Sequence, residues 1–144
     1  MFIMNPLKTE HYALKKMIAD YMENGFLENI IDMFKHDLSL YALVGELMKD
    51  ERLMVRIGIS ALLETLKKEE PENISRVIPS ILPLLKDPNP VLRSDSAYFL
   101  GIIGDKDALP FLTEATNDED ENVRIFAKEA IEEIESGSNA EKET

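Results

Sequence analysis

The residues with the greatest capacity for chemistry in this sequence form an acidic run near its C-terminal end. The run has the ligand spacing of a calcium-binding loop, with a glutamate at its twelfth position: Asp118, Asp120, Asn122 and Glu129. Such a loop needs glycine at its sixth position, and this sequence has Val123 there. We therefore predict that these acids begin a helix, where negative charge is favourable, and that they hold no metal.

Other chemical groups are isolated. The two histidines, His11 and His36, have no carboxylate or nucleophile at a spacing typical of a catalytic set. The absence of cysteine excludes disulfides, zinc–thiolate sites, iron–sulfur clusters and cysteine nucleophiles. We therefore predict a protein that is not an enzyme and that binds no cofactor.

The charge of the chain is strongly negative. Its 144 residues include 28 acids and 16 bases, a formal net charge of −12. This charge disfavours nucleic acids and anionic membranes as partners. The first residues lack the features of a signal peptide, and no window is apolar enough to span a membrane. We expect a soluble, cytoplasmic protein.

One pattern occurs three times along the chain. An aspartate is followed by an aliphatic residue and then by an arginine at the sixth position, in residues 50–56, 87–93 and 118–124. Small or apolar residues follow each arginine at steps of three and four, which predicts one face of an α-helix. A second apolar pattern precedes each aspartate, so each unit contains a helix before the aspartate and a helix after it. Pro83 lies inside such a helix and should bend or shorten it.

The segment between two of these helices, LGIIGDKDALPFL at residues 100–112, resembles the HEAT-like repeats first noted in phycobilisome lyases. The resemblance implies an all-α fold, a right-handed α-α superhelix forming a short solenoid. We expect a single repeat domain over residues 1–135, with capping helices at 1–36 and repeats at 37–135. Residues 136–144 are small and polar, and we expect a disordered tail there.

The recurring charged residues indicate a structural ladder between units. Each aspartate can cap the following helix, and each arginine can reach the aspartate of its own or a neighbouring unit. The predicted ladder consists of Asp50, Arg56, Asp87, Arg93, Asp118 and Arg124. Asp95 stands where the aligned units have Gly58 and Phe126. Two interpretations of Asp95 stay open, a local structural hydrogen bond and a functional or interfacial carboxylate.

The C-terminal helix, residues 122–135, has no further helix after it within the repeat pattern. Ile125 and Phe126 add apolar surface to its second face. The helix is interpreted either as a plain cap of the solenoid or as the contact of a weak homodimer.

The leading hypothesis for function is a small scaffold that binds a partner protein. In HEAT-like arrays the concave face carries ligands, and we assign this face to the helices before the aspartates. The predicted partner-binding residues are Leu43, Glu46, Arg76, Ser80, Pro110, Phe111 and Glu114. The alternative, implied by the resemblance, is an accessory, chaperone-like or lyase-like subunit that assists the modification or assembly of another protein.

Overall fold

The computed structural model describes the backbone of residues 6–143 and the side chains of residues 10–137. The described residues are all-α and include no strand. The longer helices are α1 (Pro6–Glu23), α2 (Leu27–His36), α4 (Leu53–Glu69), α6 (Pro90–Ile103) and α8 (Glu121–Glu143). Short α-helical and 3₁₀ segments lie between them: η1 (Leu38–Leu43), α3 (Val44–Leu47), η2 (Ile74–Val77), α5 (Ile78–Ile81), η3 (Leu82–Lys86), η4 (Lys106–Ala108) and α7 (Leu109–Ala115).

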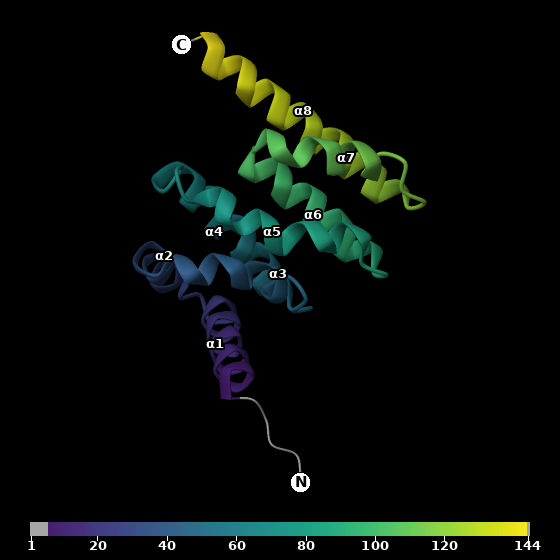
Figure 1. Cartoon of the computed structure of the whole chain (residues 1–144). Helices are drawn as coiled ribbons and strands as arrows, with labels where there is room; N and C mark the ends of the chain where they lie inside the picture. Colours follow the sequence, from purple (N-terminus) through teal and green to yellow (C-terminus); the bar gives the residue numbers. More distant parts are fainter. Residues whose placement is uncertain (1–5, 144) are drawn as a thin grey trace.

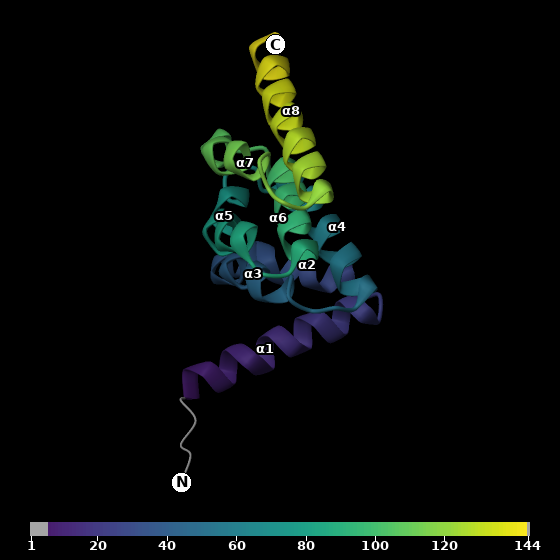
Figure 2. The ribbon, with the colours of Figure 1, turned by 90° about the vertical axis from the view of Figure 1, so that its right-hand side faces the viewer.

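The repeats stack in two layers. Figure 2 shows α3, α5 and α7 following one another on one side of the molecule, and α4, α6 and α8 on the other. The N-terminal helices α1 and α2 pack against α4 at one end of the stack, and α8 lies at the other end (Figure 1). The predicted all-α solenoid is confirmed.

Each repeat pairs the short segments before an aspartate with the long helix after it. The turns at Asp50, Asp87 and Asp118 join α3 to α4, η3 to α6, and α7 to α8. The C-terminal helix α8 packs on both α7 and α6, and no described helix follows it in the stack, as the repeat pattern predicted.

Proline explains where the first helix of the second pair is broken. Pro83 lies in the first turn of η3, directly after α5 ends at Ile81. Since proline has no N–H to donate, it cannot complete the α-helical hydrogen-bond pattern, and the segment continues in the tighter 3₁₀ form. The predicted shortening of this helix is confirmed.

The helix after the aspartate begins and ends at residues suited to those positions. In α6, the side chain of Asn89 accepts a hydrogen bond of 3.0 Å from the Val91 N–H, and Pro90 is the first helical residue. The helix ends at Gly104, whose φ of +78° is the left-handed conformation that glycine adopts without strain.

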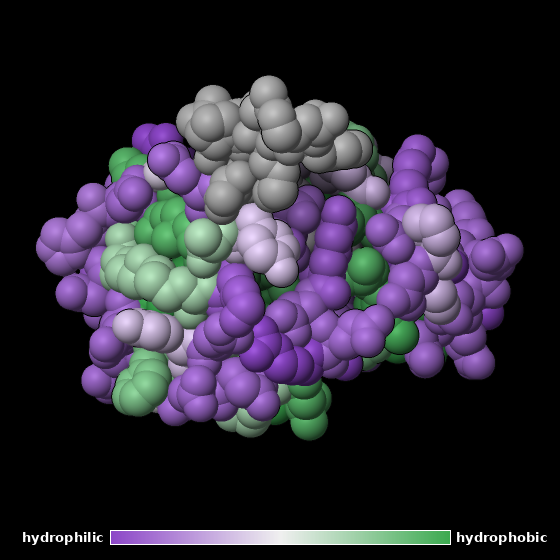
Figure 3. All heavy atoms as spheres, turned by 90° about the horizontal axis from the view of Figure 1, so that it is seen from below, coloured by the Kyte–Doolittle hydropathy of each residue, from purple (hydrophilic) through white to green (hydrophobic). Residues whose placement is uncertain are grey.

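The apolar positions at fixed steps from each arginine form one continuous core. Most are buried in all three units, as predicted: Ile59, Leu63, Leu66, Ser96, Leu100, Ile103, Ala127 and Ile134. Ile131 is half-buried. Charged and polar side chains dominate the outer surface on the face seen in Figure 3, where the hydrophobic patches are separate.

The C-terminal end differs from the expectation of a disordered tail. Helix α8 continues past Ser136 to Glu143. No proline interrupts this segment, and alanine, glutamate and lysine, which favour helix, follow its single glycine, Gly137. Thr144 lies outside the described residues.

The first and second repeats approach closely at Gly45 in α3. Its N–H donates a 3.1 Å hydrogen bond to Ser80 Oγ, and Ser80 Oγ donates to the Val77 carbonyl at 2.9 Å. A side chain at position 45 would collide with the carbonyl oxygen of Ser80. The contact therefore requires glycine, and it joins the first repeat to the second.

Replacing Gly45 by alanine tests this contact. We expect Gly45→Ala to lower the free energy of unfolding by about 2–3 kcal/mol, because the added methyl group must push two packed backbones apart. Urea denaturation followed by circular dichroism measures the change. Gly137→Ala is the matched control, since a Cβ there meets nothing within 4 Å. The control should be unchanged or more stable by up to about 1 kcal/mol. Equal unfolding midpoints for Gly45→Ala and the wild type would contradict the assignment.

Candidate functional site

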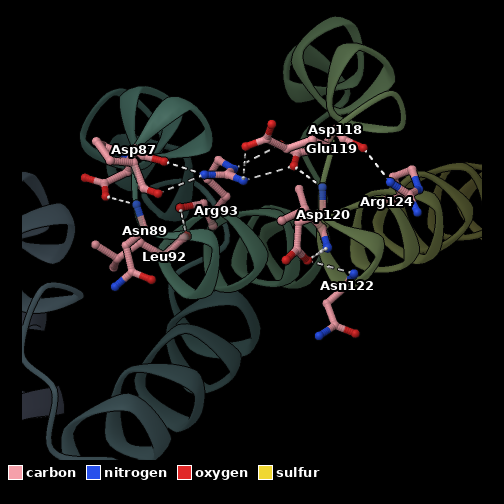
Figure 4. Close-up of polar contacts among 12 residues, drawn as sticks. Asp87, Asn89, Leu92, Arg93, Asp118, Glu119, Asp120, Asn122 and Arg124 are labelled. Atoms are coloured by element: carbon pink, nitrogen blue, oxygen red, sulfur yellow. Dashed lines mark hydrogen bonds and ion pairs between the residues drawn. The ribbon is translucent and has the colours of Figure 1, made fainter.

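Arg93 connects the second repeat to the third. Its Nε and Nη2 atoms donate to the two carboxylate oxygens of Asp118 at 3.0 and 3.1 Å. Its Nη1 atom donates to the backbone carbonyls of Asp87 and Pro88 at 2.8 and 3.2 Å (Figure 4). The two side chains are only 10% and 13% exposed. One guanidinium therefore holds both its own turn and the turn of the next repeat.

The acidic run at Asp118 is occupied by hydrogen bonds that begin α8. Asp118 Oδ1 accepts from the Asp120 N–H at 2.9 Å, and Asp120 Oδ1 accepts from the Asn122 and Val123 N–H groups at 2.8 and 3.1 Å. Arg124 Nη1 donates to the Asp118 carbonyl at 2.7 Å. These residues start a helix, as predicted. Within the part of the chain with described side chains, no group of acids and histidines is placed to hold a metal.

The protonation of Asp118 responds to opposing effects. Burial acts to raise the pKa of its carboxyl, but the hydrogen bonds from Arg93 and from the Asp120 N–H, together with the positive charges of Arg93 and Arg124, lower it by more. The net result is a pKa below the ordinary aspartate value. The ionised form of Asp118 is thus the form that stabilises the fold.

In the first repeat two arginines, Arg52 and Arg56, form the ion pairs to neighbouring helices. Arg52 donates Nε and Nη2 to Asp50 at 3.0 and 2.9 Å, and it donates Nη1 to Asp20 of α1 at 3.0 Å. Arg56 donates to both carboxylate oxygens of Asp95, each at 2.9 Å. The predicted ladder is therefore right in part: arginines do bridge successive units.

Three details of the predicted ladder differ. Arg56 pairs with Asp95, whereas Asp50 is held by Arg52. The Asp87 side chain accepts from the Asn89 N–H at 2.9 Å and so shapes its turn instead of binding an arginine. Arg52, which has no counterpart in the other units, takes the position beside Asp50, and Arg56 binds Asp95.

Asp95 is the acceptor that joins α6 to α4. Its side chain is 17% exposed, and both oxygens are bound by Arg56. The local backbone or hydroxyl bond that one interpretation expected is replaced by an ion pair between repeats. This pair explains a carboxylate at the position where the aligned units have Gly58 and Phe126.

The residues predicted to bind a partner differ in their exposure to solvent. Leu43 belongs to the core and is only 8% exposed, so its prediction as a surface residue was wrong. Its segment is a 3₁₀ helix, in which residues three apart share a face, and Leu43 therefore points inward with Leu40. Ser80 is half-buried in the joint with Gly45.

The other predicted partner residues are exposed. Glu46 pairs with Lys49 at 3.1 Å, and Arg76 donates to Asn73 at 3.1 Å. Pro110, Phe111 and Glu114 lie on α7, where Phe111 is 44% exposed. Phe111 and Glu114 line a hollow of about 540 Å³ between η3 and α7, together with Leu82 and Leu85.

A second apolar surface lies on the long helices, where the sequence did not predict a site. A hollow of about 410 Å³ between α4 and α6 is lined by the exposed side chains of Leu53, Ile57 and Tyr98. It adjoins a hollow of about 280 Å³ between α6 and α8, lined by Tyr98, Ile102 and Phe126. Glu64 and Tyr98 border both, and we call the two hollows together the long-helix groove.

Tyr98 occupies the middle of this groove. Its ring meets the edge of Phe126 with centroids 6.1 Å apart, and its hydroxyl lies 3.5 Å from Ser60 Oγ. Ile57 is 50% exposed and Tyr98 is 41% exposed. A signal was available in the sequence, since Leu53, Ile57 and Tyr98 are large apolar residues outside the predicted inward face of their helices.

Comparison with known proteins identifies the repeat. A family model described as HEAT repeats matches residues 40–132, a span that begins in η1, ends in α8 and includes all three aspartate turns. No curated protein matches the chain. The narrower resemblance to phycobilisome lyases is not confirmed. No helix in the described part of the chain is long and apolar enough to cross a membrane.

The bond between Arg93 and Asp118 gives a stability prediction. Asp118→Asn should lower the free energy of unfolding at pH 7 by about 2 kcal/mol, because Arg93 loses a charged acceptor in a largely buried site. Since folding lowers the pKa of Asp118, the advantage of the wild type is complete above about pH 4 and is lost as the pH falls through the folded-state value.

Urea denaturation at pH 7 and at pH 3 measures both parts of this prediction. Asp107→Asn is the control, because Asp107 is exposed and its side chain should contribute within about 0.5 kcal/mol. A loss for Asp118→Asn that is the same at both pH values would show that charge is not the cause.

Proposed function

The chain belongs to the HEAT-repeat family, and we propose on this basis that it is a non-catalytic protein-interaction module that holds a partner protein in the long-helix groove. HEAT repeats generally mediate protein–protein interactions. The stacked pairs of this chain give the groove a rigid floor, because each long helix is held to the next by a shared core.

The observation that carries the proposal is the grouping of exposed apolar side chains on successive long helices. Leu53 and Ile57 of α4 are 63% and 50% exposed, and they line the same hollow as Tyr98 of α6. Scattered exposed apolar residues are normal on any surface, but several beside one hollow mark a binding surface. Aromatic residues such as Tyr98 are also the type enriched at interface centres.

The surface around Phe111 is a weaker candidate for the partner. Phe111 is the one large exposed apolar residue on the described short helices from α5 to α7, and the nearby Glu114 is engaged by Lys86 at 3.3 Å. We therefore place the binding surface on the helices after the aspartates, whereas the sequence predicted it on the helices before them. Pro110, Phe111 and Glu114 remain the alternative site.

Site-specific photo-crosslinking in the native cell tests the choice between surfaces. A photoreactive phenylalanine analogue replaces Leu53, at the open end of the groove, or Phe111, on the opposite layer. We expect a discrete crosslinked product from position 53 and none from position 111. Adding Tyr98→Ser to the position-53 probe should reduce the product at least about tenfold, because the central anchor is lost.

The helical circular dichroism of each variant must match that of the wild type. A product formed only from position 111 would assign the partner to the short-helix surface. No product from either position, or a product from position 53 that Tyr98→Ser leaves unchanged, would overturn the proposed function.

A further inference from the structure

Three glutamates border the part of the long-helix groove between α6 and α8. Glu64 comes from α4, and Glu129 and Glu133 lie one turn apart on α8. All three are exposed, and they take part in none of the ion pairs between described residues. No lysine or arginine lines this hollow. Their negative charges are therefore available to a bound molecule.

The adjoining hollow adds no unpaired positive charge to the groove. Arg56 is the cation that lines it, and Asp95 holds this guanidinium by two hydrogen bonds. The groove as a whole thus combines an apolar floor of Leu53, Ile57 and Tyr98 with an acidic border at its α8 end. An occupant that matches this surface has apolar side chains and positive charges on one face.

The backbone of the groove limits the form of the occupant. The walls are α-helices, whose N–H and C=O groups are already paired within α4, α6 and α8, and no strand edge exists in the described residues. A peptide added as a β-strand would find no backbone partners there. A helix satisfies its own backbone groups and needs only side-chain contacts, which is the way amphipathic helices bind apolar grooves.

We propose that the occupant of the long-helix groove is a basic amphipathic helix of a partner protein. Its apolar side chains pack between Ile57, Tyr98 and Phe126, and its lysines or arginines face Glu64, Glu129 and Glu133. This inference rests on the proposed function and adds the chemistry of the partner to it. The net charge of −12 acts in the same direction, because it draws a basic segment toward the protein from a distance.

A synthetic helical peptide of defined composition tests the partner chemistry. The probe has about 18 residues, with leucine on one face and lysine beside that face, a length of about 27 Å as a helix. Two variants carry glutamate in place of lysine, or serine in place of leucine. We expect the original peptide to bind at least about tenfold more tightly than either variant in fluorescence anisotropy. Amide chemical shifts of the labelled protein should change on α4, α6 and α8.

Charge-reversed protein variants locate the binding. The triple variant Glu64→Lys, Glu129→Lys, Glu133→Lys should weaken the peptide at least about tenfold. The matched control reverses three exposed glutamates that line neither hollow, namely Glu10→Lys, Glu23→Lys and Glu72→Lys. It changes the net charge equally, so only a loss confined to the first variant supports a site. Tyr98→Ser should weaken the peptide similarly.

Several results would overturn the inference. Equal binding of the lysine and glutamate peptides, or equal losses in the two triple variants, would show that the groove does not select positive charge. If the protein alone forms a dimer that Tyr98→Ser dissociates, a second copy is the occupant. The proposed function stands separately, because the crosslink from position 53 and its loss in Tyr98→Ser do not depend on the charge of the partner.

Discussion

The apolar surface shared between successive helix pairs is the constraint on which this structure depends. A single pair of α7 and α8, or of η3 and α6, has too little core of its own, and each pair is completed by burying apolar residues against the next. The closest contacts require small residues, as at Gly45 against Ser80 and at Gly101, where a Cβ would lie 3.0 Å from Ala130. The contacts that stack one helix pair on the next are therefore also the contacts that stabilise the fold.

The ion pairs set how the pairs of helices align. Three ion pairs each join one helix pair of the stack to its neighbour: Asp20 with Arg52, Arg56 with Asp95, and Arg93 with Asp118. Apolar packing alone tolerates small rotations and shifts of one helix on another, whereas a guanidinium that binds both oxygens of a carboxylate has a defined geometry. The charged residues of the repeat are thus used for alignment.

The proposed function rests on the surface that the stack leaves uncovered. The short helices use much of their surface in turns and in joints such as that of Ser80, but the long helices expose Leu53, Ile57 and Tyr98 along one groove. The acidic residues around Asp118 serve to start α8, whereas Glu64, Glu129 and Glu133 on the border of the groove are exposed and take part in none of the ion pairs between described residues. The distribution of free and paired charges therefore favours a binding surface for basic helices.

The sequence by itself determined the all-α fold, the three units and most of the buried positions, because steps of three and four residues between Arg56 and Leu66, and between Arg93 and Ile103, specify one face of a helix. It also indicated that arginines would bridge units. Only the tertiary structure decided which partners they take, since Arg52 reaches Asp50 and leaves Arg56 to Asp95. The tertiary structure also determined the position of the groove. The 3₁₀ geometry of η1 buries Leu43. Residues of α4, α6 and α8 that are distant in the sequence lie together around Tyr98. Helical periodicity describes one helix, whereas a groove depends on how neighbouring helices pack.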